Sequence, residues 1–188
     1  STCGGDGTGP SRTPTKLAFT VQPNAVVEAG AAISPAVQVT VQDAQGNTVT
    51  SATTSVTLAI TSGTGAAVAT LGGTLTQASV NGVATFGDLT TDNAGAGYTL
   101  TATATSLTSA TSSAFDLTPG AAAKLGVTAQ PSAVVAGVAI SPAIQVTVQN
   151  AQGITVPSET TSVTLAITRG TGTSGAVLGG TTTVTAVA

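Results

Sequence analysis

The chain has 188 residues, of which 41% are hydrophobic, 2% aromatic and only 6% charged, and its formal net charge is −3 with no histidine. Since an average soluble domain has about a quarter of its residues charged, this surface must be wetted by hydroxyl groups rather than by ions. The 4 basic side chains are too few for the positive stripe that nucleic-acid binding needs. Without histidine, the usual general base and the commonest metal ligand are missing. The composition therefore predicts no nucleic-acid partner, no cofactor, no metal site and no enzyme activity.

Residues 1–15, STCGGDGTGPSRTPT, have no apolar periodicity and are typical of a flexible N-terminal tether. Cys3 with the Gly-Gly-Asp-Gly that follows it resembles the mature N-terminus of bacterial lipoproteins, which implies lipidation at Cys3. The alternative is an incidental thiol in a tail, since the chain has one cysteine and thus no partner for an intrachain disulfide. Because the chain starts with Ser-Thr-Cys and not Met, we expect either a removed leader or an excised fragment.

From Lys16 onward, apolar residues alternate with Thr, Gln or Ala, the period of a half-buried β-strand. Asn81-Gly82 between two such runs is a strong signal for a two-residue hairpin. No run approaches the roughly 18 apolar residues of a membrane-spanning helix. Short strands separated by regular turns predict an all-β fold, an antiparallel two-sheet sandwich. The expected strands lie near residues 17–21, 37–42, 56–60, 74–80, 83–86, 98–104 and 115–117.

The segment AVQVTVQDAQGN at residues 36–47 returns as AIQVTVQNAQGI at residues 143–154. The two copies align from Lys16 and Lys124 onward. The second copy has no residue equivalent to Glu28, and after that the alignment continues without a gap to Ala188, which is equivalent to Asn81. Such self-similarity is the signature of a tandem repeat. We therefore expect a complete sandwich at residues 16–118, a short linker at 119–123, and a partial sandwich at 124–188 that lacks its last strands.

The stretches VTVQDAQGNTV (39–49) and VNGVATFGDLTTDNAGAGYTLTATA (80–104) resemble the bacterial immunoglobulin-like repeats of invasin and intimin type surface proteins. The resemblance covers residues 16–117 and, incompletely, 124–188, and it implies tandem immunoglobulin-like sandwiches. The motif DNAGAGY at residues 92–98 also resembles the corner of such folds, where a tyrosine near the start of the sixth strand bonds back to the backbone. We therefore expect Tyr98 to be a structural pin rather than a ligand platform.

In the partial copy, Val146, Val148, Leu165 and Ile167 lack the strands that would cover them. Leaving such side chains exposed forfeits about 1.5–3 kcal/mol each, which together rivals a domain's whole margin of about 5–15 kcal/mol. Two explanations are open. Either the natural chain continues and this sequence is an excerpt, or strands of a neighbouring subunit fill the gap, as in donor-strand assembly. Head-to-tail repetition of the second arrangement would give an open filament.

Three other features suggest chemistry, each with a simpler alternative. Asp88, Asp92 and Asn93 offer oxygen ligands for calcium, although their spacing matches no ligand loop and solvated turns are the alternative. Lys16 and Asp116 lie on the expected first and last strands, where some pilus domains form an isopeptide bond with the help of a buried acid that this sequence does not clearly supply. Threonine-rich faces suit O-linked sugars, or serve only as β-formers.

Together these features predict an extracellular or cell-surface structural protein, secreted and, if Cys3 is modified, lipid-anchored. Its expected role is that of a repeat subunit in a bacterial stalk or self-assembling filament for adhesion or matrix building. The expected partners are other copies of the chain, through head-to-tail or strand-donating contacts, and a host or matrix surface. The alternative is a glycan- or ligand-binding module of a cell-surface lipoprotein, although few aromatic residues are present to stack on sugars.

Overall fold

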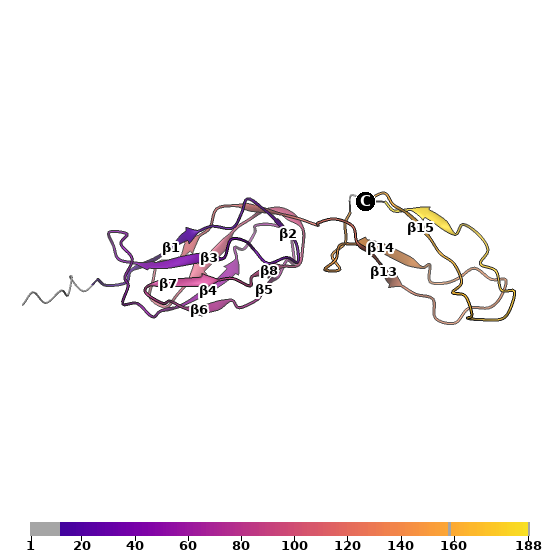
Figure 1. Cartoon of the computed structure of the whole chain (residues 1–188), viewed down its shortest axis with the longest axis horizontal. Helices are drawn as coiled ribbons and strands as arrows, with labels where there is room; N and C mark the ends of the chain where they lie inside the picture. The colour runs from indigo at the N-terminus through magenta and orange to yellow at the C-terminus, as the bar shows by residue number, and fades with distance from the viewer. Residues whose placement is uncertain (1–11, 158, 188) are drawn as a thin grey trace, which may run out of the picture. The chain divides into compact units, whose positions relative to one another are not determined.

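The computed structural model describes residues 12–157 and 159–187, and all regular elements among them are β-strands. The chain divides into two compact units, Ser1–Thr118 and Pro119–Ala188, here called unit 1 and unit 2. The strands form several mostly antiparallel sheets (Figure 1). The all-β sandwich predicted from the alternation of apolar and polar residues is therefore confirmed. A search of the described residues finds no helix that is long and apolar enough to cross a membrane.

Unit 1 is a closed sandwich of two main sheets. Its strands are β1 (Lys16–Val21), β2 (Val26–Glu28), β3 (Val37–Gln42), β4 (Ser55–Ile60), β5 (Leu71–Gly72), β6 (Thr76–Ala78), β7 (Val83–Phe86), β8 (Thr90–Thr91), β9 (Gly95–Tyr98), β10 (Leu100–Thr103), β11 (Ala110–Thr111) and β12 (Phe115–Thr118). The sheet β1-β3-β7 packs against the sheet β11-β10-β4-β6, and the small sheets β2-β12-β9 and β5-β8 complete the unit. These strands enclose the unit's hydrophobic core.

The core of unit 1 follows directly from the period of its strands. Along β3, Val37, Val39 and Val41 are completely buried, whereas on the other face Gln38 and Gln42 are partly covered and Thr40 is 5% exposed. Along β4, Val56 and Leu58 are buried in the same way, and the intervening residues are exposed. Successive side chains of a strand point to opposite faces. Each strand therefore gives one aliphatic face to the core and one hydroxyl or amide face to water.

The predicted hairpin at Asn81-Gly82 joins β6 to β7. Both residues have positive φ, 51° and 75°, as this turn type requires. The flanking residues Val80 and Val83 exchange two backbone hydrogen bonds, of 2.9 and 3.0 Å. A Cβ added at Gly82 would lie 2.5 Å from the carbonyl oxygen of Val49. Glycine is therefore required here both for its conformation and for the close approach of a neighbouring chain segment.

Unit 1 departs from the predicted strands in several places. The two-residue strands β5, β8 and β11 were not expected, and two further differences change the sheet topology. Strand β2 was not expected, and it pairs in parallel with β12, Val26 opposite Asp116. The expected strand at 98–104 is broken at Thr99, so that β9 pairs with β12 whereas β10 pairs with β4. The chain crosses here from one sheet to another, and a single continuous strand cannot belong to both.

Unit 2 contains β13 (Lys124–Ala129), β14 (Gln145–Gln149), β15 (Ser162–Thr164) and β16 (Thr183–Thr185). They form two antiparallel pairs, β13-β14 and β15-β16. The pairing of Leu125 with Val148 repeats that of Leu17 with Val41 in unit 1. These strands are thus the counterparts of β1, β3, β4 and β6. No strand among the described residues of unit 2 corresponds to β7, β9, β10 or β12.

Candidate functional site

An apolar groove of about 440 Å³ lies between the two strand pairs of unit 2. Both pairs contribute to its walls, with further residues from the segments that follow β14 and β16. Its aliphatic lining includes Ile144, Val146, Val148, Val156, Val163 and Leu165, and Glu159 and several threonines line the rest. The groove occupies the position that the core occupies in a complete sandwich, and we call it the acceptor groove.

Unit 1 shows what normally fills this space. The side chains equivalent to the groove walls, on β3 and β4, are completely buried there. They are covered by core residues of three strands without counterparts in unit 2, namely Ala84 and Phe86 of β7, Leu100 and Ala102 of β10, and Phe115 and Leu117 of β12. The acceptor groove is therefore the side of a sandwich interior that, in the described residues, no counterparts of β7, β10 and β12 cover.

At the groove, within the part of the chain that the structure describes, the outer edges of β14 and β15 also lack a partner strand for their backbone donors and acceptors. In unit 1, the amide of Val41 donates to the carbonyl of Gly82 at 2.8 Å, so the valines of β3 direct their backbone polar groups toward β7. In unit 2, Val146 stands where Val39 stands in β3, and β13 is the only strand of the described residues that pairs with β14. The turn segment Thr155–Val156 bridges the end of β14 at Val148 and Gln149, so its edge is open at Val146. Likewise β4 lies between β10 and β6, whereas in the described part of unit 2 the only strand that pairs with β15 is β16. Two open strand edges therefore flank the groove.

The residues predicted to be left uncovered differ in their exposure. Val146 and Leu165 are half-buried, and Ile167 is 41% exposed. Val148 is only 7% exposed, contrary to the expectation, because the segment after β14 folds over it. There the amide of Val156 donates to the carbonyl of Val148 at 2.9 Å. Sequence reasoning missed Ile144 and Val163, which correspond to the buried Val37 and Val56 of the complete repeat. Cys3, the lipidation candidate, lies outside the described residues.

Tyr98 is buried in the core of unit 1. Its side chain is 0% exposed, its hydroxyl donates to the carbonyl of Asn93 at 2.8 Å, and its ring centroid lies 5.8 Å from that of Phe115. A Cβ at Gly65 would lie 2.2 Å from this ring. The tyrosine thus bonds back across the corner of its own loop, and its ring is available only to the core.

Replacing Tyr98 with phenylalanine should lower the free energy of unfolding of unit 1 by about 1–2 kcal/mol, because the carbonyl of Asn93 loses its donor. Urea unfolding followed by far-UV circular dichroism measures the change. Thr99→Val is the matched control, since the hydroxyl of Thr99 is buried without a hydrogen-bond partner, so its removal should not destabilise. An equal loss in both variants would show that the hydroxyl of Tyr98 contributes nothing specific.

The acidic residues considered for calcium fasten loops instead. Asp88 accepts hydrogen bonds from the amide of Thr74, at 3.0 Å, and from its hydroxyl, at 2.7 Å, and these bonds lower the pKa of Asp88. Asp92 accepts in the same way from the amide and hydroxyl of Thr70. Each carboxylate is thus bound to its own threonine. In the described ranges, no group of three or more His, Cys, Asp or Glu residues is placed to hold a metal ion.

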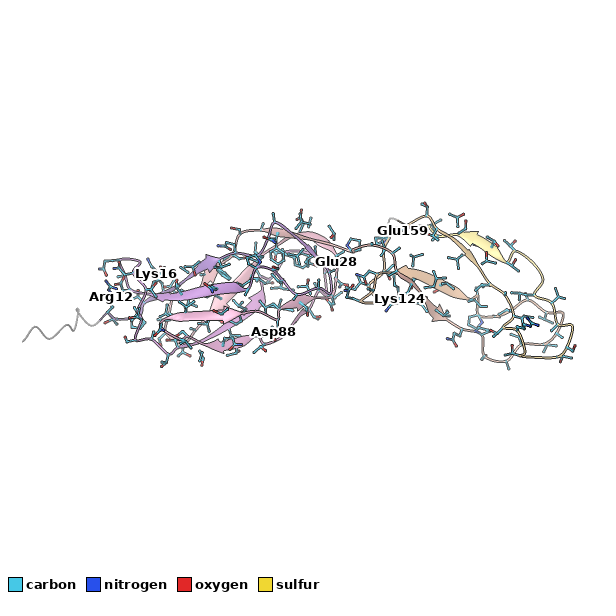
Figure 2. The ribbon with its side chains drawn as sticks, in the orientation of Figure 1. Arg12, Lys16, Glu28, Asp88, Lys124 and Glu159 are labelled. Atoms are coloured by element: carbon cyan, nitrogen blue, oxygen red, sulfur yellow. The ribbon has the colours of Figure 1, made fainter. Side chains whose placement is uncertain are left out.

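Lys16 and Asp116 are not brought together. Lys16 begins β1 and lies opposite Gln42 of β3. Asp116, in β12, lies opposite Val26 of β2, and its carboxylate accepts a hydrogen bond from the amide of Gly97 at 2.8 Å. Figure 2 shows Lys16 toward the opposite end of unit 1 from Glu28, the last residue of the strand that pairs with β12. The arrangement contradicts the isopeptide bond considered from the sequence.

Comparison of the chain with models of protein families and with curated proteins finds no match. The interpretation of the acceptor groove therefore rests on the repeat within the chain. Unit 1 provides an internal template, because it holds the same four strands in a closed sandwich. It specifies which strand positions of the complete repeat have no counterpart among the described residues of unit 2.

Proposed function

We propose that the chain is a structural subunit of an extracellular bacterial stalk or filament built from immunoglobulin-like repeats, and that strands of another polypeptide complete its unit 2. The observation that carries the proposal is the acceptor groove, flanked by the open edges of β14 and β15. Open strand edges beside an apolar groove are the features by which sheets accept added strands. The groove would thus serve to link one chain to another.

The energetics favour occupation of the groove. Val146, Val163 and Leu165 are only half-buried, so covering them fully would contribute roughly 1 kcal/mol each, about half the value for complete burial. If the incoming strand also covers the exposed Ile167, burial of that side chain adds to the free energy of binding. An added strand also satisfies backbone donors and acceptors along both open edges. The same features would make an uncovered unit 2 prone to association.

The surface supports a structural role over sugar recognition. Phe86, Tyr98 and Phe115 are buried and Phe19 is partly covered, and these are all the aromatic residues of the chain. Sugar-binding sites usually present an open aromatic face. Threonine pairs instead bridge neighbouring strands on the outside of both units, Thr57 with Thr76 at 2.8 Å and Thr164 with Thr183 at 2.9 Å. Such hydroxyl-rich faces suit an uncharged extracellular rod.

A synthetic peptide with the sequence of residues 80–104 tests the acceptor role, because it carries the hairpin turn, β7, β9 and β10. Titrated into the full chain at concentrations where the chain is monomeric, it should bind one to one and displace the dye ANS from the groove. A control peptide carrying Ala84→Asp and Leu100→Asp should not bind. If neither peptide binds, or if both bind equally, unit 2 is not a strand acceptor and the proposed function fails.

A further inference from the structure

Residues 119–123, which lead into unit 2 and are here called the lead-in segment, are bonded to that unit at both ends. The amide of Ala123 donates to the carbonyl of Gln149 at 2.8 Å. The side-chain amide of Asn150 donates to the carbonyl of Pro119 at 2.6 Å. Between these bonds, Gly120 has a φ of 75°, which glycine adopts without strain. The segment predicted to be a linker is therefore folded onto the end of β14.

Asn150 can hold Pro119 in place because its own position is fixed. The residue is 0% exposed, and its backbone amide donates to the carbonyl of Ile154 at 2.8 Å. Its side-chain oxygen accepts a hydrogen bond from the amide of Ile154 at 2.9 Å. The turn after β14 thus uses the oxygen of this side chain, and the nitrogen of the same side chain donates to the lead-in segment.

The residue before the lead-in segment is bonded to unit 1. Thr118 ends β12, pairs with Glu28 of β2, and its carbonyl accepts a hydrogen bond from the amide of Ala29 at 2.8 Å. Two consecutive carbonyls, those of Thr118 and Pro119, are thus bonded to different units. The peptide bond between them is planar and the proline ring fixes φ. The ψ angle of Pro119 is therefore the one soft backbone torsion between the two bonded carbonyls.

The counterpart of Asn150 in unit 1 is Asp43, and the comparison shows why an amide is needed in unit 2. Asp43 closes its turn in the same way, because its carboxylate accepts from the amides of Gln45 and Asn47 at 3.0 and 2.8 Å. An ionised carboxylate has no proton to donate to a backbone carbonyl. Ahead of β1 it forms an ion pair with Arg12 instead, at 3.5 Å. The same turn position thus holds the preceding segment in both units.

We propose that Asn150 is a junction clamp, which makes the lead-in segment part of unit 2 and confines the flexible passage between the units to the step from Thr118 to Pro119. An unbonded linker changes its end-to-end distance freely, whereas the clamped segment holds its length. Tension along the chain would pass from β12 through Pro119 directly to the turn after β14. A stalk or filament of such repeats would therefore not stretch at this junction. The inference does not depend on strand donation at the acceptor groove.

Asn150→Asp tests the clamp, because it keeps the oxygen that accepts from Ile154 and gives unit 2 the residue that unit 1 has in this turn. It removes the donor to Pro119 and sets a carboxylate against that carbonyl. In NMR relaxation of the full chain, the amide order parameters of residues 120–123 should fall from about 0.85, typical of rigid backbone, to below about 0.6. Asp43→Asn is the matched control and should leave these order parameters unchanged.

Pro119→Gly is a second variant, which keeps the carbonyl that Asn150 holds but frees φ. Residues 120–123 should stay ordered, while the distances between spin labels at the exposed positions Ser113 and Thr128, each changed to cysteine in a Cys3→Ser background, should spread more widely. Three results would each overturn the inference: mobile residues 120–123 in the original chain, ordered ones in folded Asn150→Asp, or a label distribution that Pro119→Gly leaves unchanged. None of them bears on the binding of peptide 80–104, which tests the proposed function.

Discussion

Replacing Leu58 with alanine is expected to lower the free energy of unfolding of unit 1 by about 3 kcal/mol, whereas the same change at its counterpart Leu165 should cost unit 2 less than about 1 kcal/mol in the monomer. Leu58 is 1% exposed, so its truncation leaves a cavity between closed sheets. Leu165 is half-buried beside the open acceptor groove, where truncation only enlarges a space that already exists.

Calorimetry of dilute protein separates the two effects, because a loss of 1 kcal/mol shifts the midpoint of a domain of this size by about 4–8 °C. Leu58→Ala should shift the unit 1 transition strongly and leave any association of chains through unit 2 unchanged. Leu165→Ala should barely alter thermal unfolding but should weaken the association of chains at high concentration. Equal destabilisation of the monomer by the two variants would mean that Leu165 is already packed in a closed core.

Adding a second copy of residues 82–118 after residue 188, together with Ala188→Asn, should close unit 2 within one chain. Ala188 stands where Asn81 stands in the complete repeat, so the substitution restores the Asn-Gly turn that leads into β7. The added strands should then bury the groove walls and stabilise unit 2 by about 5 kcal/mol or more, since several aliphatic side chains become buried. The extended chain should neither bind ANS nor self-associate.

The control for this extension is the same added segment carrying Ala84→Asp and Leu100→Asp, which places carboxylates where the core should form. That chain should retain ANS binding and concentration-dependent association. An unmodified extension that still binds ANS and still associates would show that the groove does not accept strands of this kind.

Much of the fold could be predicted from segments in which apolar and polar residues alternate. The valines of β3 and the apolar residues of β4 specify their buried faces, and Asn81-Gly82 specifies a hairpin. Strand β2 could not be predicted, because it is three residues long and pairs with β12, which is distant in the sequence. The break at Thr99 was also hidden, since apolar alternation continues from Tyr98 to Leu100 while the chain changes sheets.

The acceptor groove could be predicted only in part. The repeat shows that the last strands have no counterpart in the second copy, and this indicates that Val146 and Leu165 lose their cover. It does not show that Thr155 and Val156 fold over Val148, because that contact depends on a turn rather than on a strand.

The most direct test of the central claim, that unit 2 accepts strands at its open edges, is residue-resolved amide hydrogen exchange of the full chain at several concentrations. The amides of Val146 and Ala166 should exchange rapidly in dilute protein and slow markedly as chains associate or as peptide 80–104 is added. The amides of their counterparts Val39 and Ala59 should exchange slowly throughout. Slow exchange at Val146 and Ala166 in the most dilute monomer, or rapid exchange under every condition, would contradict the claim.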